Sequence, residues 1–240
     1  MAYDFQLPAA ASPPESLIAW QPRQRPGPVT LRGRRVTLEP FEAATHGEDL
    51  WQAICGHDEL WKYMANGPYA TEAGMVEGLE RWRQVEQAVL LAIVPVESAR
   101  AAGWASYMRI EPAHGVIEVG NIMFSPSLKR TPEATEAMYL MASHVFDHLG
   151  YRRYEWKCNA ANLASRRAAE RLGFTFEGIF RQHMVAKGQN RDSAWYSMLD
   201  REWPARKRAL ETWLDLANFD ETGRQRQPLN LPEVPRDTGR

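Results

Sequence analysis

Strand-like and helix-like segments alternate between about residues 31 and 217, and this alternation is the strongest constraint on what the chain can fold into. Short runs rich in Val, Ile, Leu and Thr indicate strands, and apolar residues three or four positions apart indicate helices. Strands are predicted at 34–41, 88–96, 102–112, 115–126 and 151–159, followed by a pair around the turn "KGQNRD". Helices are predicted at 43–65, 71–87, 131–150, 162–172 and 204–216. This order predicts an α/β (α+β) fold.

Charge and apolar content narrow the class of protein. Of the 240 residues, 29 are basic and 30 are acidic, so the chain gives no general reason to expect nucleic acid or an anionic membrane as a partner. The longest apolar run, 88–96, is too short to cross a bilayer, and the N-terminus lacks the layout of a secretory signal. We expect a cytoplasmic protein with no nucleic-acid or membrane partner, and the sequence leaves a homodimer open.

Both ends of the chain differ in composition from the middle. Residues 1–30 are rich in Pro, Ala and Gln, which predicts an extended arm, and its aromatic residues Tyr3, Phe5 and Trp20 indicate that parts of the arm pack onto the body. Residues 218–240 have the same open character and are predicted to form an extended tail. The segment 31–217 is therefore the predicted domain.

A strand, a short basic loop and a helix follow one another in "FSPSLKRTPEATEA" (124–137). Thr131 is a good N-cap, and Pro132 suits the first helical position. Free backbone N–H groups and the helix dipole make such a helix start a site for phosphate, and Lys129 and Arg130 add positive charge beside it. The alternative is a capped helix preceded by solvated basic residues.

A second helix start lies in "NAANLASRRAAERLGFTFEG" (159–178). Asn162 and Ser165 stand at its N-terminal end, where a chemical site could be built. Gly173 can take the left-handed conformation that closes the helix, and Phe174 then packs back on the last turn. Taken alone, the segment favours a tight crossover helix, with small residues that lie close to the sheet.

Together these two segments resemble the GNAT acetyltransferases, and most closely the branch that includes ribosomal-protein N-terminal acetyltransferases. The matching motifs are "N-x-x-S", "A-x-R-L-G-F-x-x-E-G" and "A-T-E-A" (134–137), within a resemblance that covers roughly residues 34–202. The resemblance implies a central mixed, mostly antiparallel sheet with two splayed parallel strands, flanked by helices. It makes 31–217 an acetyltransferase domain.

The resemblance also implies transfer of an acetyl group from acetyl-CoA to a primary amine, on a protein N-terminus or a small molecule. The pantetheine chain would pair with the backbone of Ile122, Met123 and Phe124. The pyrophosphate would rest on the loop and helix start, at Lys129, Arg130, Thr131, Glu133 and Ala134. Here Pro132 replaces a glycine of the family loop and contributes no N–H donor.

Two residues are candidates for proton transfer. The family pattern indicates Ser165 as the acid that protonates the departing CoA thiolate, with Asn162 bonded to the pantetheine, although either side chain could cap the helix instead. Glu118 is the candidate base, acting directly or through a water. Its alternative role is an outward strand glutamate paired with a basic residue.

A rival interpretation is a non-catalytic CoA-binding or protein-interaction module that keeps the fold. Pro132 supports it, and so does Met184, which stands where the ribosomal-protein branch can have a second glutamate. His183 is adjacent, but strand alternation would place it on the opposite face.

The remaining chemical groups have structural explanations. His144 and His148 have the spacing of metal ligands but no third ligand, so no metal site is predicted. Glu136 and Glu177 are expected to cap or to pair with arginines. Two cysteines are too few for a disulfide framework, and Cys158 is expected to be buried. Trp51, Trp61 and Trp82 are expected mostly in the core, with one or two lining the acceptor pocket.

Overall fold

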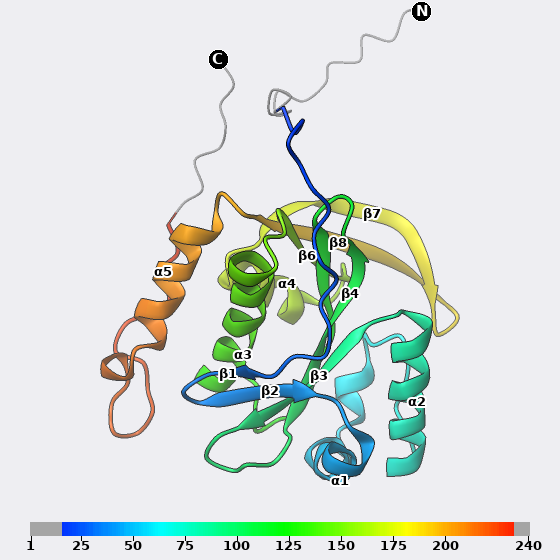
Figure 1. The fold of residues 1–240 in the computed structure, drawn as a ribbon. Helices are drawn as coiled ribbons and strands as arrows, with labels where there is room; N and C mark the ends of the chain where they lie inside the picture. Colours follow the sequence, from blue (N-terminus) through cyan, green and yellow to red (C-terminus); the bar gives the residue numbers. More distant parts are fainter. Residues whose placement is uncertain (1–15, 233–240) are drawn as a thin grey trace, which may run out of the picture.

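The computed structural model describes residues 16–232 and has one eight-stranded sheet with helices on both faces (Figure 1). The strand order is β1-β2-β3-β4-β5-β6-β8-β7, and all neighbours are antiparallel except the parallel pair β5 and β6. The strands are β1 Leu31–Arg32, β2 Val36–Pro40, β3 Val89–Pro95, β4 Gly103–Glu111, β5 Val116–Phe124, β6 Arg153–Asn159, β7 Thr175–Ala186 and β8 Gln189–Leu199. The helices are α1 Ala43–Ile54, α2 Glu72–Val85, α3 Pro132–Ser143, α4 Leu163–Arg171 and α5 Trp203–Leu214.

Alternating side chains of the central strands divide the apolar core between the two sheet faces. On β3, Leu91 and Ile93 belong to a core shared with α3, α4 and α5. Leu90 and Ala92 point the other way, into a second core with α1 and α2. The predicted mixed, mostly antiparallel sheet flanked by helices is confirmed, and each face of β3 and β4 is covered.

Two predicted helices end earlier than expected. The helix predicted at 43–65 stops at Ile54, and only a 3-10 turn, Asp58–Trp61, follows. Gly56 lies between them with a φ of 78°, a conformation that ends a helix. The helix predicted at 131–150 is α helical only to Ser143 and continues as a π-helical turn, His144–His148.

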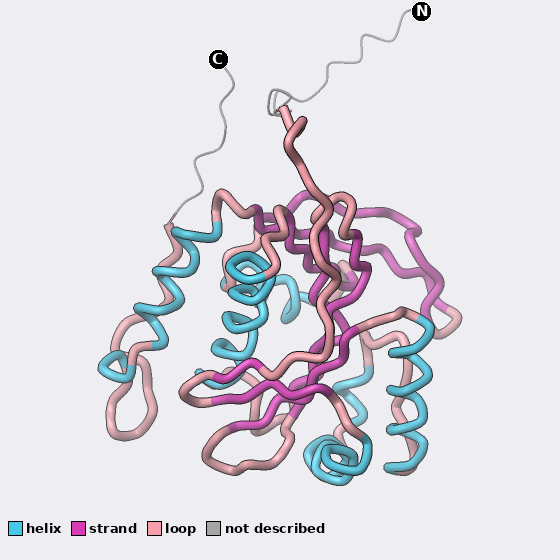
Figure 2. The backbone as a smooth tube through the Cα atoms, in the orientation of Figure 1, coloured by secondary structure: helices cyan, strands magenta, loops and turns pink. Residues whose placement is uncertain are grey.

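The described part of the N-terminal arm runs along the body as a loop before it enters β1 (Figure 2). Trp20 donates its indole N–H to the carbonyl of Ala113. Its ring packs so closely on Gly115 that a Cβ added to this glycine would lie 2.5 Å from the ring. Tyr151 donates to the carbonyl of Gln24. The expected packing of Trp20 is therefore confirmed, whereas Tyr3 and Phe5 lie outside the described residues.

Residues 218–232 also contact the body. Phe219 lies under the guanidinium of Arg35, and the side chain of Gln225 accepts a hydrogen bond from the indole of Trp213. Within residues 16–232, no helix is long and apolar enough to cross a membrane.

Glu136 ties α3 to the turn between β1 and β2. Its buried carboxylate accepts hydrogen bonds from the backbone N–H groups of Arg34, Arg35 and Val36, at 3.0, 2.7 and 2.9 Å. A Cβ at Gly33 would lie 2.5 Å from the same carboxylate, so a side chain at this position would displace it. The predicted structural role of Glu136 is confirmed, but its partners are backbone N–H groups rather than arginine side chains.

Glu136→Gln should destabilise the fold by about 3 kcal/mol, because an amide cannot accept from all three donors and leaves buried N–H groups unpaired. Urea unfolding followed by tryptophan fluorescence measures the loss. Glu133→Gln is the matched control, since Glu133 is partly exposed and its single ion pair, with Arg35, is long at 4.0 Å. It should cost less than about 1 kcal/mol. Equal losses in the two variants would contradict the role of Glu136.

Candidate functional site

β5 and β6 pair in parallel over only four residues each, 116–119 against 153–156. Both strands continue past this point, and β6 stays paired with β8 as far as Asn159. Within the described residues 16–232, the edge of β5 that faces β6 therefore has no strand partner over residues 120–124. An unpaired edge offers backbone hydrogen bonds to an extended ligand. The register thus contains the parted parallel strands that were expected.

A β-bulge lies where the two strands separate. Trp104 and Ser106 of β4 pair with Met123 and Gly120 of β5, so β5 contains one extra residue between these pairs. Asn121, inside this interval, has a φ of 48°, which is uncommon for a residue with a side chain. A bulge bends its strand and increases the local twist. This bend accompanies the divergence of β5 from β6.

The residues predicted to contact the pantetheine lie on this segment of β5. The side chain of Met123 is buried in the core with α1 and α2. Ile122 and Phe124 pack against the core on the other sheet face. Because these side chains point into the two cores, the backbone is what each of the three residues can present in the gap.

The loop after β5 is anchored at two points. Ser125 is fully buried, its backbone N–H donates to Ala102, and its carbonyl accepts from the N–H groups of Leu128 and Lys129. Leu128 packs in the core. Lys129 and Arg130 are exposed beyond these anchors, and Arg130 has a φ of 65°. The loop therefore holds two cationic residues at the surface beside the start of α3.

The start of α3 has both capped and free donors. Thr131 is the N-cap, and its hydroxyl oxygen accepts from the N–H of Ala134 at 3.2 Å. Among residues 16–232, the N–H groups of Arg130, Thr131 and Glu133 donate no hydrogen bond. An anion at this helix start would therefore find three free donors, and the N–H of Ala134 would have to leave its cap.

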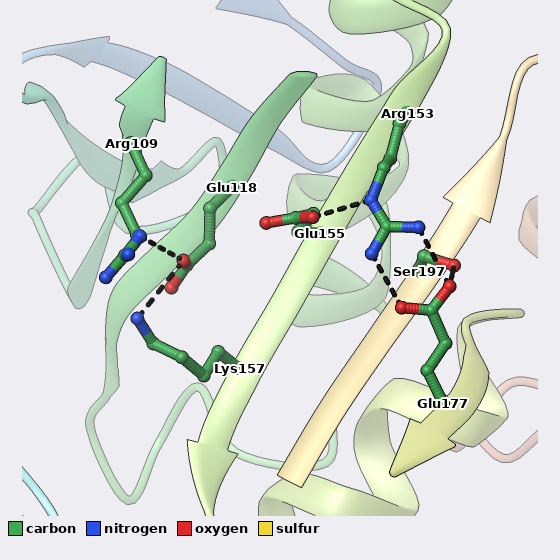
Figure 3. Close-up of polar contacts among 7 residues, drawn as sticks. All are labelled: Arg109, Glu118, Arg153, Glu155, Lys157, Glu177 and Ser197. Atoms are coloured by element: carbon green, nitrogen blue, oxygen red, sulfur yellow. Dashed lines mark hydrogen bonds and ion pairs between the residues drawn. The ribbon is translucent and has the colours of Figure 1, made fainter. Parts of the chain in front are cut away.

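Glu118 lies on β5 two residues before the gap and is only 2% exposed. Its Oε2 is 3.6 Å from Nε of Arg109 and 3.5 Å from Nζ of Lys157, and Figure 3 shows the carboxylate between the two cations. Burial raises the pKa of Glu118 to about 7, while Lys157 and Arg109 act in the opposite direction and Glu155 adds to the rise. Glu118 is thus paired with basic residues but is not outward facing.

A second β-bulge directs Arg109 at this carboxylate. Met108 and Glu111 of β4 pair with Glu118 and Val116, so β4 has one extra residue at this point. Arg109 lies in the bulge with a φ of 46°. Strained backbone of this kind is common at functional sites.

A separate ion-pair group lies beside Glu118 (Figure 3). Arg153 donates from both Nη atoms to Glu177, at 2.8 and 2.6 Å, and from Nε to Glu155 at 2.5 Å. Ser197 also donates to Glu177, and the hydrogen bonds from Arg153 contribute most to lowering its pKa. The predicted structural role of Glu177 is confirmed.

The two candidates at the start of α4 have different roles. Asn162 is the N-cap, and its side-chain oxygen accepts from the N–H of Ser165 at 3.1 Å. Ser165 caps nothing; its hydroxyl oxygen accepts from the indole N–H of Trp156 at 3.0 Å. The O–H of Ser165 therefore remains able to donate. Cys158 is buried as expected, and burial raises the pKa of its thiol.

The prediction that strand alternation places His183 on the opposite sheet face is wrong, because β7 has two extra residues between Phe180 and Met184. His183 contacts Ser193, with Nδ1 2.9 Å from the hydroxyl oxygen, and its ring lies edge-on to Trp195. It therefore lies on the same sheet face as Lys157. Burial is the largest cause of its lowered pKa, followed by the charges of Lys157 and two arginines.

Sequence reasoning missed Arg109, Lys157 and Trp195 around Glu118. Lys157 and Arg109 both lie over the ring of Trp195, at 5.2 and 5.9 Å. Alternation in "YRRYEWKCN" predicts that Lys157 lies on the polar face of its strand. The residue that Lys157 contacts there depends on how this strand pairs with β5, which alternation does not predict.

The structure also shows where possible metal ligands and the tryptophans lie. Within residues 16–232, no three His, Cys, Asp or Glu side chains are grouped to hold a metal ion. Trp61 is in the core, against Trp104 and Tyr69, whereas Trp51 and Trp82 are partly buried. Trp195 is the tryptophan that contacts the partners of Glu118.

Residues 35–175 match a family model described as an acetyltransferase (GNAT) domain. The crystal structure of a GCN5-related N-acetyltransferase from Brucella melitensis is 46% identical, with a TM-score of 0.83 over 89% of this chain and 97% of that chain. The Bacillus subtilis (strain 168) protein named "Putative ribosomal N-acetyltransferase YdaF" is 24% identical over 75% of this chain and 95% of its own length. Microcin C7 self immunity acetyltransferase MccE, in complex with acetyl-CoA and AMP, shares the fold at 23% identity, with a TM-score of 0.59 over 70% of this chain and 93% of its own.

These similarities agree with the mixed α/β fold of the chain. The family model spans more than half of the chain, and the Brucella protein aligns along almost all of it. Acetyltransferases of this fold use acetyl-CoA as the acetyl donor. The chain belongs to the GNAT family of acetyltransferases.

Proposed function

We propose that this protein is an acetyl-CoA-dependent N-acetyltransferase that acetylates a primary amine by direct attack in a ternary complex. The observation that carries the proposal is the unpaired edge of β5, with Glu118 just before it. Family membership supports acetyl transfer in general. The proposal includes a cytoplasmic location.

The donor's pantetheine chain would pair with the backbone of Ile122, Met123 and Phe124. Its pyrophosphate would accept from the N–H groups of Arg130, Thr131 and Glu133, beside the charges of Lys129 and Arg130. Three free donors and α3's dipole make this loop fit an anion although Pro132 has no N–H. This fit favours a functional donor site.

In the proposed reaction the acceptor ammonium first loses a proton to the carboxylate of Glu118, directly or through a water. The amine nitrogen then attacks the thioester carbonyl, the new C–N bond forms and the C–S bond breaks. The nitrogen loses its second proton to solvent, and Glu118 releases the first one to solvent to complete the turnover. Ser165 donates its proton to the departing thiolate and regains one from solvent, while the indole N–H of Trp156 stabilises its oxygen. Holding both substrates in line supplies much of the acceleration.

The first test is binding and turnover on the full chain. Calorimetric titration with acetyl-CoA should show binding, and a thiol-release assay over a panel of amines should show turnover. Binding without release on any amine would instead favour a non-catalytic CoA-binding module. Absence of acetyl-CoA binding would contradict both the N-acetyltransferase and the CoA-binding module.

Ser165→Ala should lower kcat by about 10-fold or more and change the acetyl-CoA Kd by less than about 3-fold, because the hydroxyl acts on the leaving thiolate. Stopped-flow turnover and calorimetry measure the two quantities. Asn162→Ala is the control: it removes the cap of α4 and should cost about 1 kcal/mol of stability. Unchanged kcat in Ser165→Ala would remove Ser165 from the mechanism.

Glu118→Gln should abolish the rise of activity that is centred near pH 7. Burial raises the pKa of Glu118 to about 7, so wild-type Glu118 is protonated and inactive as a base below that pH and active above it. A glutamine cannot titrate. At pH 8 the variant should lose about 100-fold in kcat.

Glu155→Gln provides the control for this profile. The charge of Glu155 raises the pKa of Glu118, so its removal should keep the rise and move its midpoint to lower pH. A pH–rate profile from pH 5 to 9 distinguishes the variants. A Glu118→Gln profile that matches wild type would exclude Glu118 as the base.

A further inference from the structure

Positive charge exceeds negative charge on the sheet face around Glu118. Arg109 of β4 and Lys157 of β6 each lie within 3.6 Å of its carboxylate. Arg191 of β8 adds a third positive charge, which together with theirs lowers the pKa of His183 after the larger effect of burial. Glu155, the next carboxylate, is bound by Arg153. Arg109 and Lys157 therefore share the carboxylate of Glu118, and no ion pair of Arg191 with a carboxylate is found within residues 16–232.

Two donors on β8 have nothing to donate to. Ser193 and Trp195 pair regularly with β6 and share the face that carries Lys157. Arg191 lies two residues before Ser193 on the same strand, opposite the bulge of β7, and alternation places it on this face as well. Nε of Arg191 and Nε1 of Trp195 are buried, and within residues 16–232 neither has a hydrogen-bond partner. A buried donor without an acceptor is costly. An anion bound beside Arg191 and Lys157 would neutralise the charge of both side chains and could accept from the unpaired N–H of Arg191.

The same face has an exposed aromatic surface. Phe180 of β7 is 51% exposed and packs on Trp195 with a ring distance of 4.8 Å, and His183 lies edge-on to both rings. An apolar side chain of an acceptor could cover Phe180. A cationic polyamine, in contrast, would meet three positive charges.

We propose that the acceptor is a free α-amino acid with an apolar or aromatic side chain, whose carboxylate is bound by Arg191 and Lys157. The inference rests on the proposed function. Lys157 lies 3.5 Å from the oxygen of the base, so an anion held by Lys157 is close to the amine that Glu118 deprotonates. A short link between amine and carboxylate, as in an α-amino acid, fits both contacts.

The test compares phenylalanine with phenethylamine, which has the same ring and amine but no carboxylate. With acetyl-CoA and purified full-length protein, kcat/KM for phenylalanine should be about 10- to 100-fold higher, mainly through a lower KM. Arg191→Gln should lower this ratio about 10-fold, because only Lys157 remains to bind the carboxylate. Arg181→Gln, an exposed arginine on β7, is the matched control and should keep the wild-type ratio. The ratio is measured on one preparation, so partial misfolding does not change it.

Other outcomes overturn the inference in distinguishable ways. Equal turnover of phenethylamine and phenylalanine would refute it and leave the proposed N-acetyltransferase intact. Preference for a Phe-Asp peptide over phenylalanine would replace the free amino acid by a peptide N-terminus. If acetyl-CoA binds but no amine is acetylated, the proposed function fails and the inference fails with it.

Discussion

The candidate site depends on the parting of β5 and β6. Two parallel strands that pair over four residues and then diverge leave backbone groups on β5 without partners, and such groups are costly unless water or a ligand meets them. The bulge at Asn121 bends β5 at this point. The loop after β5 and the start of α3 then lie at the end of the unpaired edge, so strand, loop and helix can contact different parts of one extended ligand.

Long-range contacts hold the segments around this gap together. The loop between α1 and α2 reaches both sides: Tyr63 donates to the carbonyl of Ala161 before α4, and Lys187 from the turn between β7 and β8 donates to the carbonyl of Trp61. On the other sheet face, Glu136 joins α3 to the turn of β1 and β2. These contacts link elements that are distant in sequence, so the site is supported from both sheet faces.

Electrostatics around Glu118 combine two opposing effects. Burial disfavours the charged carboxylate, and the nearby cations favour it. The result is a carboxyl group that titrates near neutral pH, where a general base is most effective. Several cations gather on the same sheet face although the charge of the whole chain is near neutral.

Local sequence determined the element order, the capped start of α3, the closure of α4 at Gly173 and the burial of Cys158, because caps, glycines and apolar periodicity act within a few residues. The motifs around 124–137 and 159–178 also identified the family. Tertiary structure alone decided that Lys157 and Arg109 meet Glu118, that two bulges redirect Arg109 and His183, and that Ser165 is bonded to Trp156 rather than capping α4. Strand register and bulges set these contacts, and both arise from pairing between segments far apart in the chain, which no local pattern encodes.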